Sequence, residues 1–418
     1  MRGDVPALPL AAAAVAVQAA ITVGAFGLLA RELPLAQVGR FGLYLAVTSL
    51  AMGIDGIRQA VVVAVATGER PHGEYVQHLG AISLLTGLSF AAILAMTGVN
   101  LLESRWTEAL PVALCTFLLL ALGPGLGVLE AVKGPHYSAI LQSGSWSVAI
   151  GVGTLGSLLC RDVTMAAWAV LLAPLVVFVG LMAWDAGVRP SMNRVDSSRR
   201  VASQAMRSHI VTGFSGFVDK GAVAFFGNAV ALGLYTPLAE FSARAGAMAG
   251  GVANLFLRSE VRIAANSAPH TGGHRFIVGA MVYSMCTLGL VTALAAEPLL
   301  RLFLGRTDPS QVLTSRLLLA CLTLNAGAHW SVVVLKARAQ FDLYKPYTAS
   351  LVLALLLAPL LVTRFGIVGA GMVALVVRSA DALILHRAGR LIGRRHELAV
   401  LATTMLILLV AVRGAAEA

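Results

Sequence analysis

About a dozen stretches of roughly 20 mostly apolar residues follow one another along this chain, and they constrain its fold more than any other feature. A helix of about 20 apolar residues is long enough to cross the ~30 Å hydrocarbon layer of a bilayer. Within lipid, every backbone N–H and C=O group needs a partner in the protein, and a helix supplies these partners within one segment. The sequence therefore predicts an all-α polytopic membrane protein.

The apolar stretches form two groups of six, separated by the most polar part of the chain, 186–206. A shorter thirteenth run, 398–412, follows a basic segment. The expected spans are 9–30, 41–66, 76–101, 109–132, 137–160 and 164–184 in the first group, and 207–228, 233–257, 276–304, 313–335, 347–363 and 367–386 in the second. The expected parts are an N-terminal six-helix lobe, a basic cytoplasmic linker, a C-terminal six-helix lobe, and a basic segment with a short terminal helix: 1–185, 186–206, 207–388 and 389–418.

The composition agrees with a membrane protein. Of the 418 residues, 58% are hydrophobic and only 12% are charged, whereas soluble domains average about 25% charged residues. The net charge of +11 would suggest a nucleic-acid partner in a soluble protein, but basic residues of membrane proteins collect in cytoplasmic loops. We therefore expect no nucleic acid, and we expect anionic membrane lipids to attract the basic linker.

The distribution of Lys and Arg between alternate connections predicts the orientation. If the N-terminus is cytoplasmic, the connections on its side hold more than twice as many Lys and Arg residues as those on the opposite side, to which Arg31, Arg40 and Arg316 are assigned. The N-terminus and the linker are therefore expected in the cytoplasm. The first apolar run extends to Ala30, which is long for a signal peptide, so we expect it to be retained as a span.

A repeated motif relates the two groups of spans. FGLYLAVTSLA, from Phe41, aligns with LGLYTPLAEFS, from Leu232, so that Gly42 matches Gly233, and each motif opens the second helix of its group. Two halves with the same order and an even number of spans are related by a pseudo-two-fold axis along the membrane normal. The repeat therefore predicts two lobes with the substrate site at their interface.

Charged residues lie inside several expected spans, where an unpaired charge costs at least ~2.5–3.5 kcal/mol. Three acid–base pairs have the i,i+3 or i,i+4 spacing that places both side chains on one helix face. Asp219 and Lys220 are adjacent and point about 100° apart, so at least one of them must face another helix, a cavity or a ligand. The three spaced pairs are Asp55 with Arg58, Glu240 with Arg244, and Arg378 with Asp381.

Two interpretations of these charges remain open. The pairs can simply neutralise each other and fix helix packing. Alternatively, the bases Arg58, Lys220, Arg244 and Arg378 bind a phosphate-containing substrate, since the Arg side chain forms paired, charge-assisted bonds to phosphate. The acids would then bind a proton or sodium ion and couple transport to its gradient. The candidates for that coupling are Asp55, Asp219, Glu240 and Asp381.

Other polar features of the spans are weaker signals. Asn325 is expected to form a packed hydrogen bond between helices rather than to line a path. Cys115, Cys160, Cys286 and Cys321 have no metal or disulfide spacing and are expected to act as small buried hydrophobic residues. No motif for a catalytic residue or a metal site is found in the sequence.

Several stretches resemble one family. LLARELPLAQVGRFGLY and GIDGIRQA resemble the entry to the second helix of the polysaccharide exporters and O-antigen flippases, and FVDKGAVAFFGNAVALGLYTPLAEF resembles their seventh and eighth helices. EPLLRLFLGRTDPSQVLTSRLLLACLTLN and RFGIVGAGMVALVVRSADALIL resemble their later helices. The family belongs to the multidrug/oligosaccharidyl-lipid/polysaccharide (MOP) exporter superfamily, which also includes lipid II flippases and drug antiporters. Many members have twelve or fourteen spans, unlike the twelve and one short run here.

This resemblance implies a flippase of the bacterial cytoplasmic membrane that carries an undecaprenyl-diphosphate-linked oligosaccharide for O-antigen, capsule or exopolysaccharide assembly. It further implies alternating access between two lobes, no cofactor, a functional monomer, and glycosyltransferases or a glycan polymerase as partners. The second, seventh and eighth helices would flank the cavity, which places Arg58, Lys220 and Arg244 there. The closest alternative is a lipid II flippase. A drug or cation antiporter is disfavoured by the four bases within spans, and a glycan polymerase or ligase by the short outer connections.

Overall fold

The computed structural model describes residues 7–54, 80–91 except 82, 106–185, 211–255 except 212, 272–337 except 306, and 344–417 except 393. The linker 186–206 lies outside these residues, as do Asp55 and Arg58. Every regular element among the described residues is a helix, as the apolar runs predict. The helices of the first half are α1 (Ala7–Glu32), α2 (Leu35–Ile54), α5 (Trp106–Lys133), α6 (Pro135–Cys160), α7 (Thr164–Ala169) and α8 (Leu172–Asp185).

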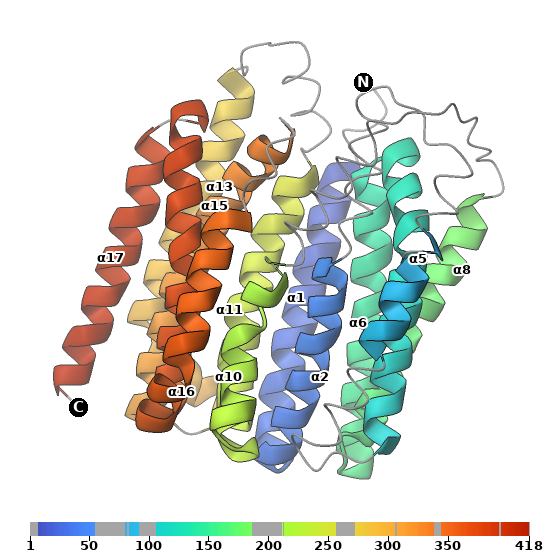
Figure 1. Cartoon of the computed structure of the whole chain (residues 1–418), viewed down its shortest axis with the longest axis horizontal. Helices are drawn as coiled ribbons and strands as arrows, with labels where there is room; N and C mark the ends of the chain where they lie inside the picture. The colour runs from blue at the N-terminus through green and yellow to red at the C-terminus, as the bar shows by residue number, and fades with distance from the viewer. Residues whose placement is uncertain are drawn as a thin grey trace.

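The helices of the second half stand alongside those of the first (Figure 1). The helices α1 and α17 begin at the same end of the bundle, and α1 ends near the point where α2, α11 and α15 begin (Figure 1). We call this second end the Glu32 end. The helices of the second half are α10 (Val218–Phe226), α11 (Ala229–Leu255), α13 (Gly272–Leu294), α14 (Ala296–Leu304), α15 (Pro309–Ala337), α16 (Tyr344–Ile392) and α17 (Arg394–Glu417).

Seven of the described helices are long and apolar enough to cross a membrane, or eight if the bent pair α13–α14 forms one span. That pair bends by 75° between Leu294 and Ala296, so the expected span 276–304 is broken near its end. On α14, Glu297 and Arg301 are exposed while Ala296 and Leu300 are buried. The helix therefore has one face against the protein and one polar face away from it.

The long helix α16 contains two of the expected spans, joined at Gly366. Gly366 has φ 56° and ψ −129°, a backbone conformation that L side chains rarely adopt. In a continuous helix, residues eight positions apart are separated by about 12 Å. Gly369 instead lies so close to Leu361 that a β carbon on Gly369 would overlap the Leu361 carbonyl group. The chain therefore folds back on itself at Gly366, between the expected spans 347–363 and 367–386.

The thirteenth apolar run, expected as a short helix, is part of a longer one. α17 has 24 residues, and Arg394–Ala415 is long and apolar enough to cross a membrane. It packs against α13 and α15, and Arg316 of α15 donates a hydrogen bond to the Val410 carbonyl near its end. α17 begins at the opposite end of the bundle and ends at the Glu32 end, so it runs along the full height of the second lobe (Figure 1).

Local capping explains where two helices of the second half begin. Asp308 precedes Pro309, a residue favoured in the first helical turn, and its carboxylate accepts the Ser310 N–H of α15. Gln311 closes a reciprocal capping box by accepting the Asp308 N–H. At α11, the Asn228 side chain accepts the Ala231 N–H at 2.7 Å.

The two groups of helices form two lobes, each with its own apolar core. In the first lobe, Phe26 of α1 stacks on Phe41 of α2, and both are buried with residues of α5, α6 and α7. In the second lobe, α10, α11, α15 and α16 share a buried cluster around Tyr235. Leu43 and Val47 of α2 join this second cluster, and Phe90 packs against it, so residues of the first half contribute to the core of the second lobe.

Glycines bring α2 and α11 together at the Glu32 end. A β carbon on Gly39 would lie 2.7 Å from the Ala229 carbonyl oxygen, and one on Gly42 would overlap the Thr236 side chain. A β carbon on Gly233 would overlap the Leu35 carbonyl group. The two lobes therefore meet backbone to backbone at this crossing, as small residues permit between membrane helices.

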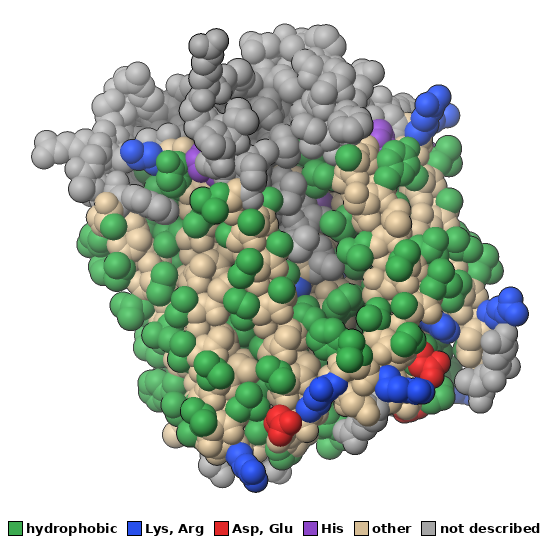
Figure 2. Space-filling model, turned by 180° about the vertical axis from the view of Figure 1, so that it is seen from behind, with side chains coloured by type: hydrophobic (Ala, Val, Ile, Leu, Met, Phe, Trp, Pro, Cys, Tyr) green, Lys and Arg blue, Asp and Glu red, His purple; other side chains and the backbone are tan. Residues whose placement is uncertain are grey.

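The structure corrects the placement of two basic residues and one cysteine. Arg40 and Arg316, assigned above to connections, lie inside α2 and α15 and make contacts between helices. Cys160 is exposed at the end of α6, whereas the other three cysteines are buried as expected. On the face seen in Figure 2, apolar side chains form a broad belt, and most of the coloured charged side chains gather near the lower end. This belt is what a membrane-spanning bundle requires.

Candidate functional site

Six of the eight charged residues predicted from the sequence lie close together in the second lobe. They are carried by α10, α11 and α16, which pack against one another and against α15. We call them, with their hydrogen-bonding partners, the C-lobe polar cluster: Asp219, Lys220, Tyr235, Glu240, Arg244, Asn325, Tyr347, Arg378 and Asp381.

Glu240 is shared by two bases. Its Oε1 atom contacts the Lys220 ammonium of α10, and its Oε2 atom lies 3.0 Å from Arg244 Nε, one turn further along α11. The i,i+4 pairing is the one that the spacing predicts, but the contact with Lys220 joins two helices and cannot be read from spacing. Lys220 and Glu240 are 5% and 3% exposed, whereas Arg244 is 16% exposed. The buried part of this site is therefore a tight Lys–Glu pair with Arg244 at its edge.

Asp219 points to a different partner from its neighbour Lys220. The Tyr235 hydroxyl of α11 donates a hydrogen bond of 2.6 Å to Asp219 Oδ2. Both adjacent residues of α10 thus find partners on α11, which satisfies the requirement that at least one must face another helix. Tyr235 is a neutral donor, so this contact does not neutralise the charge of Asp219.

Asp381 is completely buried and joins the two segments of α16, before and after Gly366, to α15. It accepts hydrogen bonds from the Tyr347 hydroxyl and from Asn325 Nδ2 of α15, the latter at 3.3 Å. Arg378 Nη1 lies 3.6 Å from Asp381 Oδ2, which confirms the pairing predicted from the i,i+3 spacing. The contact of Asn325 confirms its expected role between helices.

The three bases and three acids of the C-lobe polar cluster balance each other. Lys220, Arg244 and Arg378 each have a carboxylate within ion-pair distance. Around Glu240, however, two bases share one acid, which leaves a local positive charge. Arg244 and Arg378 are the more exposed bases, with side-chain exposures of 16% and 24%.

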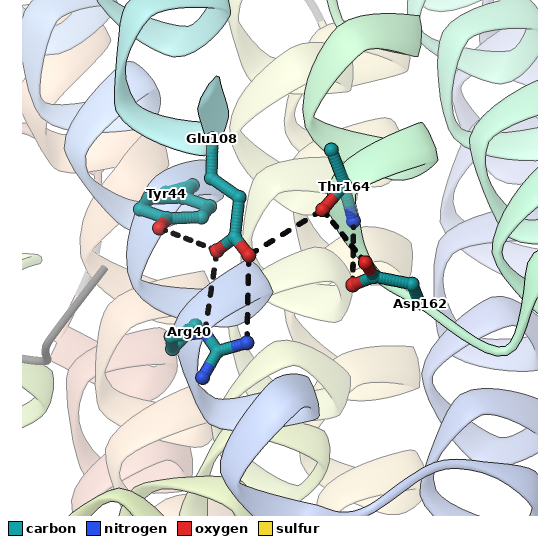
Figure 3. A network of polar contacts seen from close by, with 5 residues as sticks. All are labelled: Arg40, Tyr44, Glu108, Asp162 and Thr164. Atoms are coloured by element: carbon teal, nitrogen blue, oxygen red, sulfur yellow. Dashed lines mark hydrogen bonds and ion pairs between the residues drawn. The ribbon is translucent and has the colours of Figure 1, made fainter. Parts of the chain in front are cut away.

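A second buried polar group lies in the first lobe, at the Glu32 end, and was not predicted. Glu108 of α5 is 1% exposed, and Arg40 Nε lies 3.2 Å from its Oε2 atom. The Tyr44 hydroxyl donates to the same carboxylate at 2.9 Å, and the single proton of the Thr164 hydroxyl is shared between Asp162 at 3.0 Å and Glu108 at 3.5 Å (Figure 3). We call these five residues the Glu108 cluster. They join α2, α5 and the start of α7.

The repeat offers the sequence signal for this second group. Tyr44 and Tyr235 are the last residues of the FGLY and LGLY motifs. Both are buried, and each donates its hydroxyl proton to a carboxylate of its own lobe, Glu108 or Asp219. The glycine of each motif lies at the crossing of α2 and α11. The repeated motif therefore has the same two roles in each lobe: its tyrosine donates to a carboxylate, and its glycine allows the two lobes to approach closely.

The pair on the second expected span is not placed by the structure. Asp55 and Arg58 lie outside the described residues, so their predicted pairing remains a prediction. Within the described part of the chain, no group of three or more His, Cys, Asp or Glu side chains could hold a metal ion.

Comparisons with known proteins identify the fold. No protein-family model and no curated protein sequence matches the chain. Among solved structures, the lipid II flippase MurJ in an inward closed conformation superimposes with a TM-score of 0.68 at 13% identity, covering 97% of this chain and 98% of that one. An inward-facing MATE-family multidrug transporter of the MOP superfamily gives 0.58 at 14% identity, covering 94% of each chain. The MATE multidrug transporter DinF-BH gives 0.58 at 12% identity, covering 92% of this chain and 96% of that one.

These likenesses extend over almost the whole chain. The two-lobed, all-α membrane fold predicted from the sequence is therefore confirmed, and it is the fold of MurJ and of the MATE transporters.

Proposed function

Because the chain has the fold of MurJ and the MATE transporters, we propose that it is a flippase. It moves a polyprenyl-diphosphate-linked oligosaccharide from the cytoplasmic to the outer leaflet by alternating access between its lobes. The observation that carries this proposal is the full-length likeness to MurJ, a flippase whose substrate, lipid II, is itself a lipid-linked molecule. The product serves O-antigen, capsule or exopolysaccharide assembly.

The crossing of α2 and α11 supports alternating access. The lobes meet backbone to backbone at the Glu32 end. With the N-terminus in the cytoplasm, this end faces outward, so the described arrangement is closed to the outside. Transport then requires the crossing to separate, while each lobe keeps its own core.

The local positive charge near Glu240 supports an anionic substrate. Lys220 is the more buried partner and neutralises Glu240, which leaves the guanidinium of Arg244 available for a diphosphate. Arg378, also partly exposed, provides a second planar donor. Arg binds phosphate through parallel, charge-assisted hydrogen bonds. We assign Arg244 and Arg378 to the headgroup, Lys220 to the positioning of Glu240, and Arg58 to the same path.

Asp219 is the best-placed acid for coupling. Glu240 and Asp381 each contact a base, so protonating either would break an ion pair. Asp219 instead accepts its hydrogen bond from the neutral Tyr235 hydroxyl, so proton uptake there disrupts neither of these ion pairs. We assign Asp219 as the proton site, with Asp55, Glu240 and Asp381 as the remaining candidates for ion coupling.

Reconstitution tests the proposal. Purified protein is placed in proteoliposomes with a fluorescent polyprenyl-diphosphate-linked oligosaccharide, and an added lectin reports the fraction of headgroups that reach the outer surface. We expect flipping above the rate of protein-free vesicles, and its loss in Arg244→Ala. Lipid II and ethidium, a cationic drug, are tested in parallel.

The parallel substrates decide between the alternatives. Faster flipping of lipid II than of the oligosaccharide would identify a lipid II flippase. Uptake of ethidium without movement of either lipid would identify a drug antiporter and refute the proposal. Polymerised glycan in the reaction products would indicate the polymerase or ligase alternative.

A further inference from the structure

An apolar recess lies between the two lobes, and none of its lining residues belongs to the C-lobe polar cluster. Together with the open solvent space at its edge, the recess amounts to about 540 Å³. Val23 and Gly27 of α1 form the wall from the first lobe, and α11, α13, α14 and α15 form the rest. Thr292 and Ser315 are the polar residues among its lining, and none of the lining residues is charged.

The 75° bend between α13 and α14 shapes this recess. After the bend, α14 turns one face inward, and Leu300 and Phe303 of that face line the recess. Within α11, Pro237 lines the opposite side and lacks the N–H of a regular helix. Apart from Thr292 and Ser315, the lining residues are apolar, so a diphosphate or a hydrated ion would bind poorly there.

An arginine lies beside one wall of the recess. Arg31 is exposed on α1, and its Nε donates a 2.9 Å hydrogen bond to the carbonyl of Phe303. Eight residues separate Arg31 from Val23, or about 12 Å along the helix, close to the ~15 Å of hydrocarbon in one leaflet. The Arg31 guanidinium therefore lies beside Phe303 of the recess lining, about 12 Å along α1 from Val23.

We propose that this recess binds one acyl chain of an anionic phospholipid, with the phosphate at Arg31. The Phe303 contact uses one of the five N–H donors of the guanidinium, and the terminal nitrogens can bind a phosphate. Because the recess has walls from both lobes, the bound lipid stabilises the arrangement in which α1 and α14 lie together. The inference does not depend on the transported substrate.

Native mass spectrometry of the purified, delipidated protein tests this site, with phosphatidylglycerol, phosphatidylcholine or a polyprenyl phosphate added at equal concentration. We expect one tightly retained phosphatidylglycerol. Val23→Phe and Leu299→Trp, which fill the recess at two different walls, should each weaken its retention at least tenfold. Arg31→Gln should reduce the preference for phosphatidylglycerol over phosphatidylcholine to about one.

Matched variants control for folding and for surface charge. Val17→Phe adds the same ring to α1 at an exposed position, and Arg301→Gln removes an exposed arginine from the other face of α14; both should retain the lipid as the parent does. The proposal is wrong if both filling variants, folded by thermal unfolding, still retain it. It is also wrong if phosphatidylcholine binds equally to the parent, or if the polyprenyl phosphate displaces phosphatidylglycerol.

Discussion

Gly233 of α11 lies against the backbone of Leu35 in α2, so close that a β carbon on Gly233 would overlap the Leu35 carbonyl group. Real β carbons essentially never approach another atom below 3.0 Å. Only glycine therefore permits this crossing, and the residue at position 233 controls how closely the two lobes approach at the Glu32 end.

Gly233→Ala should force the lobes apart at the Glu32 end, since the clash is with backbone and cannot be relieved by a rotamer change. Spin labels at Glu32 and Leu302, two exposed positions on opposite lobes, measure the separation after Cys160 is replaced by Ser. We expect a longer distance in the variant. Gly151→Ala is the control, because a β carbon there meets nothing within 4 Å. An unchanged distance, with the protein destabilised by ~1–3 kcal/mol through overpacking, would show that the crossing is rigid.

Glu240 contacts both Lys220 and Arg244. A double substitution that tests the role of Arg244 alone must therefore not leave Lys220 without a partner. Removing Glu240 and Arg244 together leaves Lys220 buried without its carboxylate, which costs several kcal/mol. Lys220→Met with Glu240→Gln instead removes the buried pair and keeps Arg244. We expect this variant to fold and to retain oligosaccharide flipping, and adding Arg244→Gln to abolish it. If the triple variant flips at the rate of the double variant, Arg244 has no role in substrate binding.

Asp219→Asn should separate transport from the proton gradient. The amide still accepts the Tyr235 hydrogen bond, so we expect normal insertion and thermal stability. Flipping in proteoliposomes should continue down the substrate gradient but no longer increase when a proton gradient is imposed. Asp381→Asn provides the contrast, since it leaves Arg378 without its acid and should lower stability. If flipping by Asp219→Asn still increases when a proton gradient is imposed, Asp219 is not the proton site and another acid couples transport to the gradient.

The Glu108 cluster should stabilise the first lobe through the Arg40 ion pair. Glu108→Gln leaves Arg40 without its acid, and since Arg40 is 22% exposed, we expect a loss of about 1–3 kcal/mol. Arg40→Gln combined with Glu108→Gln should recover much of that loss, measured by thermal unfolding in detergent. The same pair of changes at Glu297 and Arg301, an exposed pair, should cost at most ~1 kcal/mol. If the Arg40–Glu108 and Glu297–Arg301 substitutions lower the stability by the same amount, the Arg40–Glu108 ion pair does not stabilise the first lobe more than an exposed pair does.

The thirteenth span should place the two ends of α17 on opposite sides of the membrane. With Cys160 replaced, a cysteine at Ala415 should react with an impermeant maleimide in intact cells. A cysteine at Arg387, exposed at the other end of the bundle, should react only after permeabilisation. Labelling of both from outside would refute the crossing, and the reverse pattern would invert the predicted orientation.

The sequence alone determined the features that depend on one segment at a time. An apolar run of about 20 residues forms a membrane helix because the helix satisfies its own backbone, so the spans, including α11 and α15, could be located. Helical spacing placed Glu240 beside Arg244 and Arg378 beside Asp381, since residues three or four apart share a face in any helix.

Only the tertiary structure decided which helix faces meet. Lys220 and Glu240 are 20 residues apart, and Tyr44 and Glu108 are 64 apart; no periodicity relates such pairs, because the register between two helices depends on how their side chains pack. The repeated FGLY and LGLY motifs predicted a duplication, but not that their glycines would lie at one crossing or that each tyrosine would hold a carboxylate. The break at Leu294–Ala296, which shapes the recess beside α1, likewise appears only once α13 and α14 pack against other helices.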